Sequence, residues 1–169
     1  SDFLLLKYNN SGSLLLNQQF DLNNVHDVPV SLMVTSTRLA IAGATQVGVT
    51  DWDYLYVAYH PVNGSYISHS TSTGGTAGFD KVHDLQTDAS GNFYLTGTVF
   101  NASTGYDILT VKLDDNLNVI WSANYNSTST MNDVGNALAV DNAGNVMVTG
   151  FSETSTEGTN YVTIQYNSS

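Results

Sequence analysis

One short phrase of apolar residues occurs four times along this chain, and it constrains the fold more than any other feature. The copies occupy residues 2–9, 53–60, 107–114 and 160–167, so successive copies begin 51, 54 and 53 residues apart. A period of about 50 residues is typical of repeat proteins, in which each unit is too small to bury its own apolar face. The fold is therefore expected to arise from the packing of successive units against one another.

A second, longer phrase lies between the copies of the first and keeps the same period. Residues 80–97 and 133–150 match position by position with an offset of 53, and a less similar copy at 27–43 is one residue shorter at its turn. Both long copies contain an Asp-x-x-Gly-Asn segment, which begins at Asp88 in one and at Asp141 in the other. This segment predicts a β-turn, because aspartate accepts backbone hydrogen bonds and glycine tolerates positive φ.

The segment 53–60 predicts a β-strand that is covered on both faces. It is rich in Tyr, Val and Leu, which suit a pleated surface, and no segment of the chain has a clear helical period. Successive residues of a strand point to opposite faces, so Tyr54 and Tyr56 would lie on one face and Leu55 and Val57 on the other. Both faces are then apolar, as in the middle of stacked sheets.

Four short strands in each unit of about 50 residues are the arrangement of a β-propeller blade. We therefore expect an all-β fold of four-stranded antiparallel blades, with about three blade units in one repeat domain over residues 1–169. Polar loops such as residues 70–75 would connect the blades. The repeat units are approximately residues 2–52, 53–106, 107–159 and a partial unit at 160–169.

The repeated residues resemble the bacterial SBBP-type β-propeller repeat family. The pattern of that family is a strand like Asp-Tyr-Leu-Thr-Val-Lys-Tyr-Asp, a strand ending in Trp-Ser, and a stretch that closes with Asp-x-x-Gly-Asn-Val-Tyr-Val-Thr-Gly. Residues 107–114, Trp121-Ser122 and 133–150 match it closely, 80–97 matches it well, and 27–43 matches it poorly. The resemblance implies a propeller on an exported or surface-attached bacterial protein, and it carries over no active site.

The sequence begins and ends part-way through a blade. If the strands of a blade are lettered A to D, with an A strand near residues 133–140, the order along the chain is CD, ABCD, ABCD, ABC. Propellers need about four to eight blades to close a ring. We therefore expect an excerpt of a longer repeat chain, or self-association through incomplete terminal blades, since an unpaired C strand at 161–166 would expose backbone groups. A compact alternative closes the first C and D strands against the last A and B strands.

The charge of the chain excludes several classes of partner. It has 4 basic and 15 acidic residues, for a net charge of −11, whereas nucleic-acid binding needs Lys and Arg. We expect no nucleic-acid partner, and no membrane insertion because no apolar run is long enough to span a bilayer. Cysteine is absent, so disulfides and thiol chemistry are excluded. The acidity either keeps a polar surface soluble, which is the simpler explanation, or permits cation binding.

Asp27, Asp80 and Asp133 recur at the start of the expected A strands. One interpretation makes them a ring of carboxylates near a central channel that holds Ca²⁺ together with backbone carbonyls. The other interpretation is that each aspartate accepts backbone N–H groups and caps a loop. Repetition in every unit favours the cap, because structural requirements recur in every repeat. Apart from this Ca²⁺ hypothesis, we expect no cofactor.

Trp52 is the aromatic residue that we expect to touch a ligand, if any does. Most tyrosines lie in or beside the repeated strand, where packing between blades explains them. Trp52 occupies no common repeat position and lies in an expected loop beside Asp51 and Asp53. Because the rings of Tyr and Trp stack on sugars, these three residues are the candidate ligand-binding site.

Catalysis is not expected from this sequence. His83 and Asp84 are neighbours on a strand, so they point to opposite faces and form no relay, and no zinc motif is present. We expect a non-enzymatic binding or scaffold module of an exported bacterial surface or extracellular protein, acting in adhesion or extracellular assembly. Its partner would be a protein or a glycan. The alternative is a lectin-like carbohydrate-binding or carbohydrate-active propeller.

Overall fold

Antiparallel strands make up the regular structure of this chain. A computed structural model describes residues 2–72, 76–127 and 130–168. The strands are β1 (Phe3–Tyr8), β2 (Leu14–Phe20), β3 (Asp27–Val34), β4 (Leu39–Gly48), β5 (Asp51–Tyr59), β6 (Tyr66–Ser72), β7 (Lys81–Thr87), β8 (Phe93–Asn101), β9 (Gly105–Leu113), β10 (Val119–Tyr125), β11 (Asp133–Val140), β12 (Val146–Thr154) and β13 (Gly158–Tyr166). Within these residues, no helix is long and apolar enough to cross a membrane.

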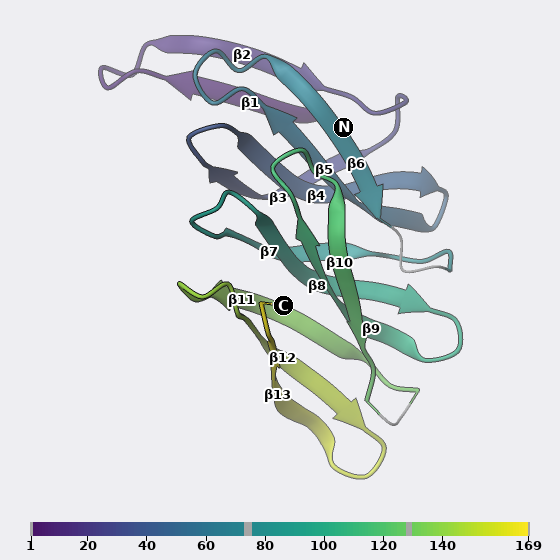
Figure 1. Cartoon of the computed structure of the whole chain (residues 1–169). Coiled ribbons are helices and arrows are strands. Elements are labelled where there is room, and N and C mark those ends of the chain that lie inside the picture. Colours follow the sequence, from purple (N-terminus) through teal and green to yellow (C-terminus); the bar gives the residue numbers. More distant parts are fainter. Residues whose placement is uncertain (1, 73–75, 128–129, 169) are drawn as a thin grey trace.

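The strands form four antiparallel sheets that follow one another along the chain. The first sheet is β1–β2, the second and third are the four-stranded sheets β3–β6 and β7–β10, and the fourth is β11–β13. The all-β fold and the four-stranded antiparallel sheets are thus confirmed. Figure 1 shows the sheets as an open stack, with the first sheet (purple) and the fourth sheet (yellow) at opposite ends. Because β1 pairs with β2 and lies far from β12, the compact closure of the chain onto itself is not formed.

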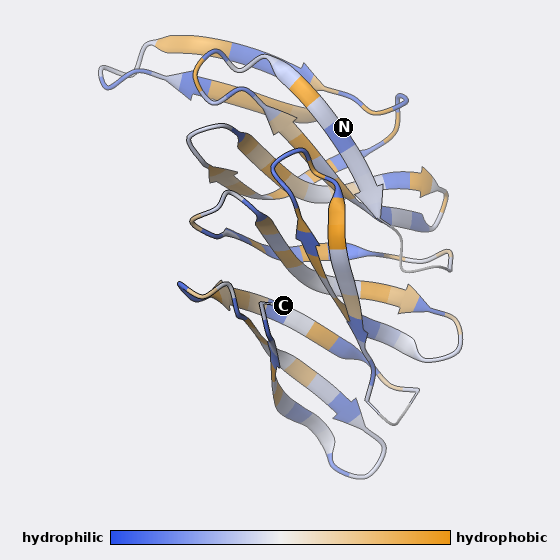
Figure 2. Ribbon diagram, viewed as in Figure 1, coloured by the Kyte–Doolittle hydropathy of each residue, from blue (hydrophilic) through white to orange (hydrophobic). Residues whose placement is uncertain are grey.

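Strand β5 is covered on both faces, as the sequence predicted. Tyr54 and Tyr56 belong to an apolar cluster between the second and third sheets. Leu55 and Val57 belong to a second cluster, which lies between the first and second sheets. A third cluster, with Tyr94 and partners from β11 to β13, joins the third sheet to the fourth. Figure 2 shows the hydrophobic colour concentrated along these strands, so the stability of each sheet depends on its neighbours.

The Asp-x-x-Gly-Asn segments form the predicted turns. The Asp88 carboxylate accepts hydrogen bonds from the backbone N–H groups of Ser90 and Asn92, each at 2.9 Å. Gly91 adopts φ of +85° in this turn. Leu117 takes the glycine position in the equivalent turn after β9, at φ of +66°, and its side chain is buried in the core. Burial of an apolar side chain therefore offsets backbone strain at one turn.

Two features of the strands differ from the sequence expectations. Strand β6 continues to Ser72 and pairs with β5 along the segment where a polar loop was expected from residue 70; residues 73–75 lie outside the described part. In addition, the first strand of each large sheet carries a β-bulge, centred on Val30 in β3, His83 in β7 and Asn136 in β11. These three residues occupy equivalent repeat positions, so the bulge is a repeated feature of the fold.

Candidate functional site

A groove of about 450 Å³ runs across the first strands of the second, third and fourth sheets. Strand β3 contacts β7, and β11 contacts β7, β8 and β9. The groove lies where β3, β7 and β11 begin. Its walls are mainly valine and aromatic side chains. The residues that line it are Val28, Val30, Ala44, Trp52, Phe79, Asp80, Lys81, His83, Thr98, Tyr106, Asn132, Val134 and Phe151.

The β-bulges help to place side chains in this groove. A bulge leaves one residue without a cross-strand partner and redirects its side chain relative to the regular pleat. Val30 and His83 are the bulged residues of β3 and β7, and both line the groove. The positions of Val30 and His83 in the groove therefore depend on β-bulges. The alternation of residues in the sequence does not reveal these bulges.

Trp52 lines the groove beside Phe79, which lies in the segment before β7. The rings are stacked, with centroids 6.1 Å apart and an interplanar angle of 19°. Two backbone hydrogen bonds hold the pair: the Trp52 N–H donates to the Gly78 carbonyl at 2.7 Å, and the Asp80 N–H donates to the Trp52 carbonyl at 2.9 Å. The aromatic pair thus joins the second sheet to the start of the third.

The expected loop around Trp52 is wrong, because all three candidate residues belong to strand β5. Strand β4 continues to Gly48, so cross-strand pairing reaches as far as Asp51. The Asp51 carboxylate accepts the Gly78 N–H at 3.0 Å, and Asp53 lies opposite Thr45 in the sheet. Trp52 contributes to the groove wall, whereas Asp51 and Asp53 are not among its lining residues.

His83 is held by a hydrogen bond between sheets. Its Nδ1 lies 2.9 Å from the Gly135 carbonyl oxygen on β11. A carbonyl only accepts, so Nδ1 carries the hydrogen and donates it. Burial lowers the pKa of His83, although the Gly135 carbonyl acts in the opposite direction. This hydrogen bond joins β7 to β11, and Nδ1, which donates it, is not available as a catalytic base.

Asp27, Asp80 and Asp133 are all buried at the starts of the first strands. The Asp27 carboxylate accepts the Leu22 N–H at 2.9 Å, and that of Asp133 accepts the Ser127 N–H at 2.7 Å. The Asp80 carboxylate accepts the Phe100 N–H at 2.8 Å, and Asp80 also lines the groove. These bonds are the caps of the second interpretation.

The Ca²⁺ hypothesis stays a prediction. One carboxylate oxygen of Asp27 and one of Asp133 are buried with no hydrogen-bond partner in the described structure. However, residues 2–72, 76–127 and 130–168 contain no group of three or more His, Asp or Glu side chains placed to hold a metal ion. Any ion bound here would therefore need backbone carbonyls for most of its ligands.

Comparison with known proteins adds no relative. No known protein-family model matches this chain. A search of curated proteins also gave no match. The function must therefore be argued from the repeat, the groove and the exposed faces of the sheets.

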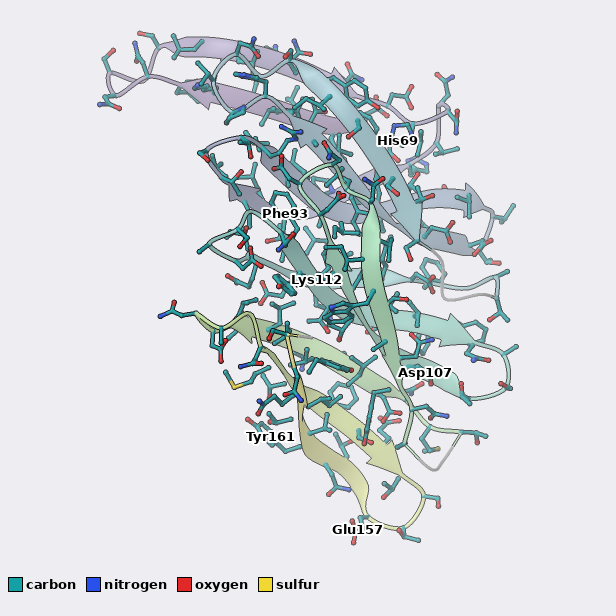
Figure 3. All side chains as sticks on the ribbon, viewed as in Figure 1. His69, Phe93, Asp107, Lys112, Glu157 and Tyr161 are labelled. Atoms are coloured by element: carbon teal, nitrogen blue, oxygen red, sulfur yellow. The ribbon has the colours of Figure 1, made fainter. Side chains whose placement is uncertain are left out.

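Asp107 is a buried carboxylate at the start of β9, close to Asp133 of the next sheet. Its side chain accepts a hydrogen bond from the Thr104 hydroxyl at 2.8 Å. Burial raises the pKa of Asp107 above its usual value, and the charge of Asp133 raises it further. Figure 3 labels Asp107 at the edge where the third and fourth sheets meet.

We expect the Asp107→Asn variant to be more stable than the original chain at neutral pH. A raised folded-state pKa means that unfolding becomes easier as pH rises from the ordinary aspartate pKa through the raised value. Asparagine keeps an acceptor for Thr104 and removes the buried charge. Urea unfolding at about pH 4 and about pH 7 should therefore show an advantage of the variant that grows with pH. An advantage that is absent at neutral pH, or equal to that of the exposed control Asp21→Asn, would contradict this account.

Proposed function

We propose that this protein is a non-enzymatic binding module whose inner groove holds an apolar segment of a protein partner. The observation that carries the proposal is the groove itself, whose lining includes three valines and four aromatic residues, among them the stacked pair Trp52 and Phe79. Binding sites are commonly apolar and concave, with a few polar groups that fix orientation. The polar lining residues here include Asp80, Lys81, His83, Thr98 and Asn132.

We further propose that the chain belongs to an SBBP-type β-propeller of an exported or surface-attached bacterial protein, acting in adhesion or extracellular assembly. The support is the 53-residue repeat, whose units fold as successive antiparallel sheets. Further support is that the first strands of neighbouring sheets lie against one another, β3 against β7 and β7 against β11, as the innermost strands of propeller blades do. In such a ring the groove would lie at the mouth of the central channel.

A lectin-like function is the second candidate, and Trp52 is the observation that favours it. Aromatic rings stack on the apolar faces of sugars, and half of the Phe79 surface beside Trp52 is exposed. Against this candidate, the groove offers few hydrogen-bond donors and acceptors for sugar hydroxyls. We therefore rank a protein partner above a glycan.

The Trp52→Ala variant should weaken ligand binding by at least about tenfold, because the loss of a buried aromatic contact costs more than 1.4 kcal/mol. The probes are a phage-displayed peptide library and a glycan array, each screened against the original chain and the variant. We expect peptides rich in Leu, Phe and Tyr to be selected. Binding of such peptides that is equally strong to Trp52→Ala would refute the groove as their site, and glycan binding that vanishes in Trp52→Ala would favour the lectin.

A fluorescent reporter makes this test specific for the groove. The chain has two tryptophans, and Trp121 lies away from the groove, where it packs against Tyr94 and Tyr166. The Trp121→Phe variant leaves Trp52 as the only tryptophan. A selected peptide should shift the emission of that variant, whereas a peptide that binds elsewhere should leave it unchanged.

A further inference from the structure

One repeat position, found in β1, β5, β9 and β13, is buried three times and exposed once. Phe3 in β1, Tyr54 in β5 and Ile108 in β9 are buried against the following sheet. The equivalent residue of β13 is Tyr161, which is 82% exposed. Figure 3 shows Tyr161 at the end of the stack, on the fourth sheet. The aromatic side chain of Tyr161 is therefore exposed on the face where a following sheet would pack.

The opposite end of the stack shows the complementary feature. Leu4 and Leu6 in β1 are 59% and 40% exposed, whereas their repeat equivalents in β5, Leu55 and Val57, are fully buried against the preceding sheet. Tyr8, Leu14 and Leu15 extend the same exposed apolar surface at this end, which Figure 2 shows as orange along β1 and β2. Within the described residues, no sheet packs on this surface.

The two exposed faces are the two halves of one repeated interface. We define the leading face by residues of β1 and β2 that share one side of the first sheet: Leu4, Leu6, Tyr8, Leu14, Asn17 and Gln19. We define the trailing face by residues on the outer side of the fourth sheet: Ala137, Ala139, Met147, Thr149, Phe151, Tyr161, Thr163 and Gln165. Each face has one carboxylate at its border: Glu153 lies on the same side of β12 as Phe151, and Asp2 accepts a hydrogen bond from the leading-face residue Gln19.

We propose that this chain associates head to tail with a second copy of itself, the trailing face of one copy packing on the leading face of the next. Each contact would continue the packing already seen between consecutive sheets of one chain, in which a strand of this kind buries both of its faces. Such a heterologous interface builds a ring or a filament according to the rotation at each step. This proposal does not rest on the function proposed for the groove, although Phe151 of the trailing face also lines the groove.

Sedimentation velocity on the 169-residue chain tests the proposal, because a monomer has a mass of 18.2 kDa. We expect the original chain to sediment as oligomers. Leu6→Asp and Tyr161→Asp should each weaken association by about thirtyfold or more, because each places an unpaired charge in the packed interface. Val49→Asp is the matched control: Val49 is 92% exposed in the turn between β4 and β5, and its substitution should leave the oligomers intact.

A mixture of the two variants gives the decisive result. Leu6→Asp keeps an intact trailing face and Tyr161→Asp keeps an intact leading face, so the mixture should form a one-to-one dimer and nothing larger. Circular dichroism of each variant checks that the fold is retained. The proposal is overturned if the original chain stays monomeric, or if the mixture forms no dimer. A dimer that survives in Tyr161→Asp alone would also overturn it, since that result indicates a symmetric contact of two leading faces.

Discussion

Replacement of Phe93 by alanine is expected to lower the free energy of unfolding by about 3–5 kcal/mol. Phe93 lies on β8 and is fully buried in the apolar cluster between the second and third sheets. Figure 3 labels it between those sheets. Truncation removes the whole ring and leaves a cavity that two sheets with their own hydrogen-bonded frameworks cannot easily fill. The loss is a large share of the total stability of a domain, which is about 5–15 kcal/mol.

Urea unfolding monitored by circular dichroism measures this effect, at a protein concentration low enough to suppress self-association. The control is Val49→Ala, whose side chain is exposed and which should change stability by less than about 0.5 kcal/mol. A loss below about 1 kcal/mol for Phe93→Ala would mean that the second and third sheets do not depend on each other for stability. The stacked arrangement of the sheets would then be wrong for the chain in solution.

The repeat made much of this fold predictable from the sequence. Alternating apolar residues in the segment 53–60 defined a strand with two buried faces, and the structure places Tyr54 and Leu55 in different clusters. The turns at Asp88 and Asp141 were predictable because their hydrogen bonds run within a few residues of the chain. Local pattern and local hydrogen bonds are the information that a sequence carries directly.

The groove was only partly predictable, because its walls come from three sheets. Trp52 was selected for its unusual position in the repeat, and it does line the groove. Phe79, Tyr106 and Phe151 were missed. Tyr106 occupies the repeat position of Trp52, immediately before Asp107 as Trp52 is before Asp53, so the repeat was a signal that could have found it. The β-bulge at His83 was also missed, because an extra residue in one strand is visible only against the register of its partner strand.

A repeated glycine was the available signal for the bulges. Gly43, Gly97 and Gly150 end the repeated phrase, and each lies opposite the bulged region of the neighbouring strand. A Cβ atom on any of them would overlap a backbone carbonyl oxygen of that strand; the oxygens belong to Val28, Lys81 and Val134. Glycine in a strand often marks a bulge or a close backbone approach, and here it marks both.

Gly97→Ala should therefore destabilise the protein by about 3 kcal/mol, although it adds only one methyl group. Besides the Lys81 carbonyl oxygen, the new Cβ would lie 2.9 Å from the Val82 Cα and 2.7 Å from the Tyr54 hydroxyl. The two backbone obstacles cannot rotate away as a flexible side chain does, so β7 and β8 must separate at the bulge. Because Gly97 does not have positive φ, the cost comes from this crowding and not from the backbone conformation of alanine.

Gly12→Ala is the control that separates crowding from backbone strain. Gly12 has φ of +80° and no atom within 4 Å of a new Cβ, so its substitution should cost only about 1–2 kcal/mol from the left-handed conformation. Urea unfolding of both variants gives the comparison, and hydrogen exchange should show the loss of protection concentrated in β7 and β8 for Gly97→Ala. If Gly97→Ala lowers the free energy of unfolding no more than Gly12→Ala does, then strand β7 can move away from β8 at little cost. The bulge that places His83 in the groove would then be easily deformed, and the groove would not be a preformed binding site.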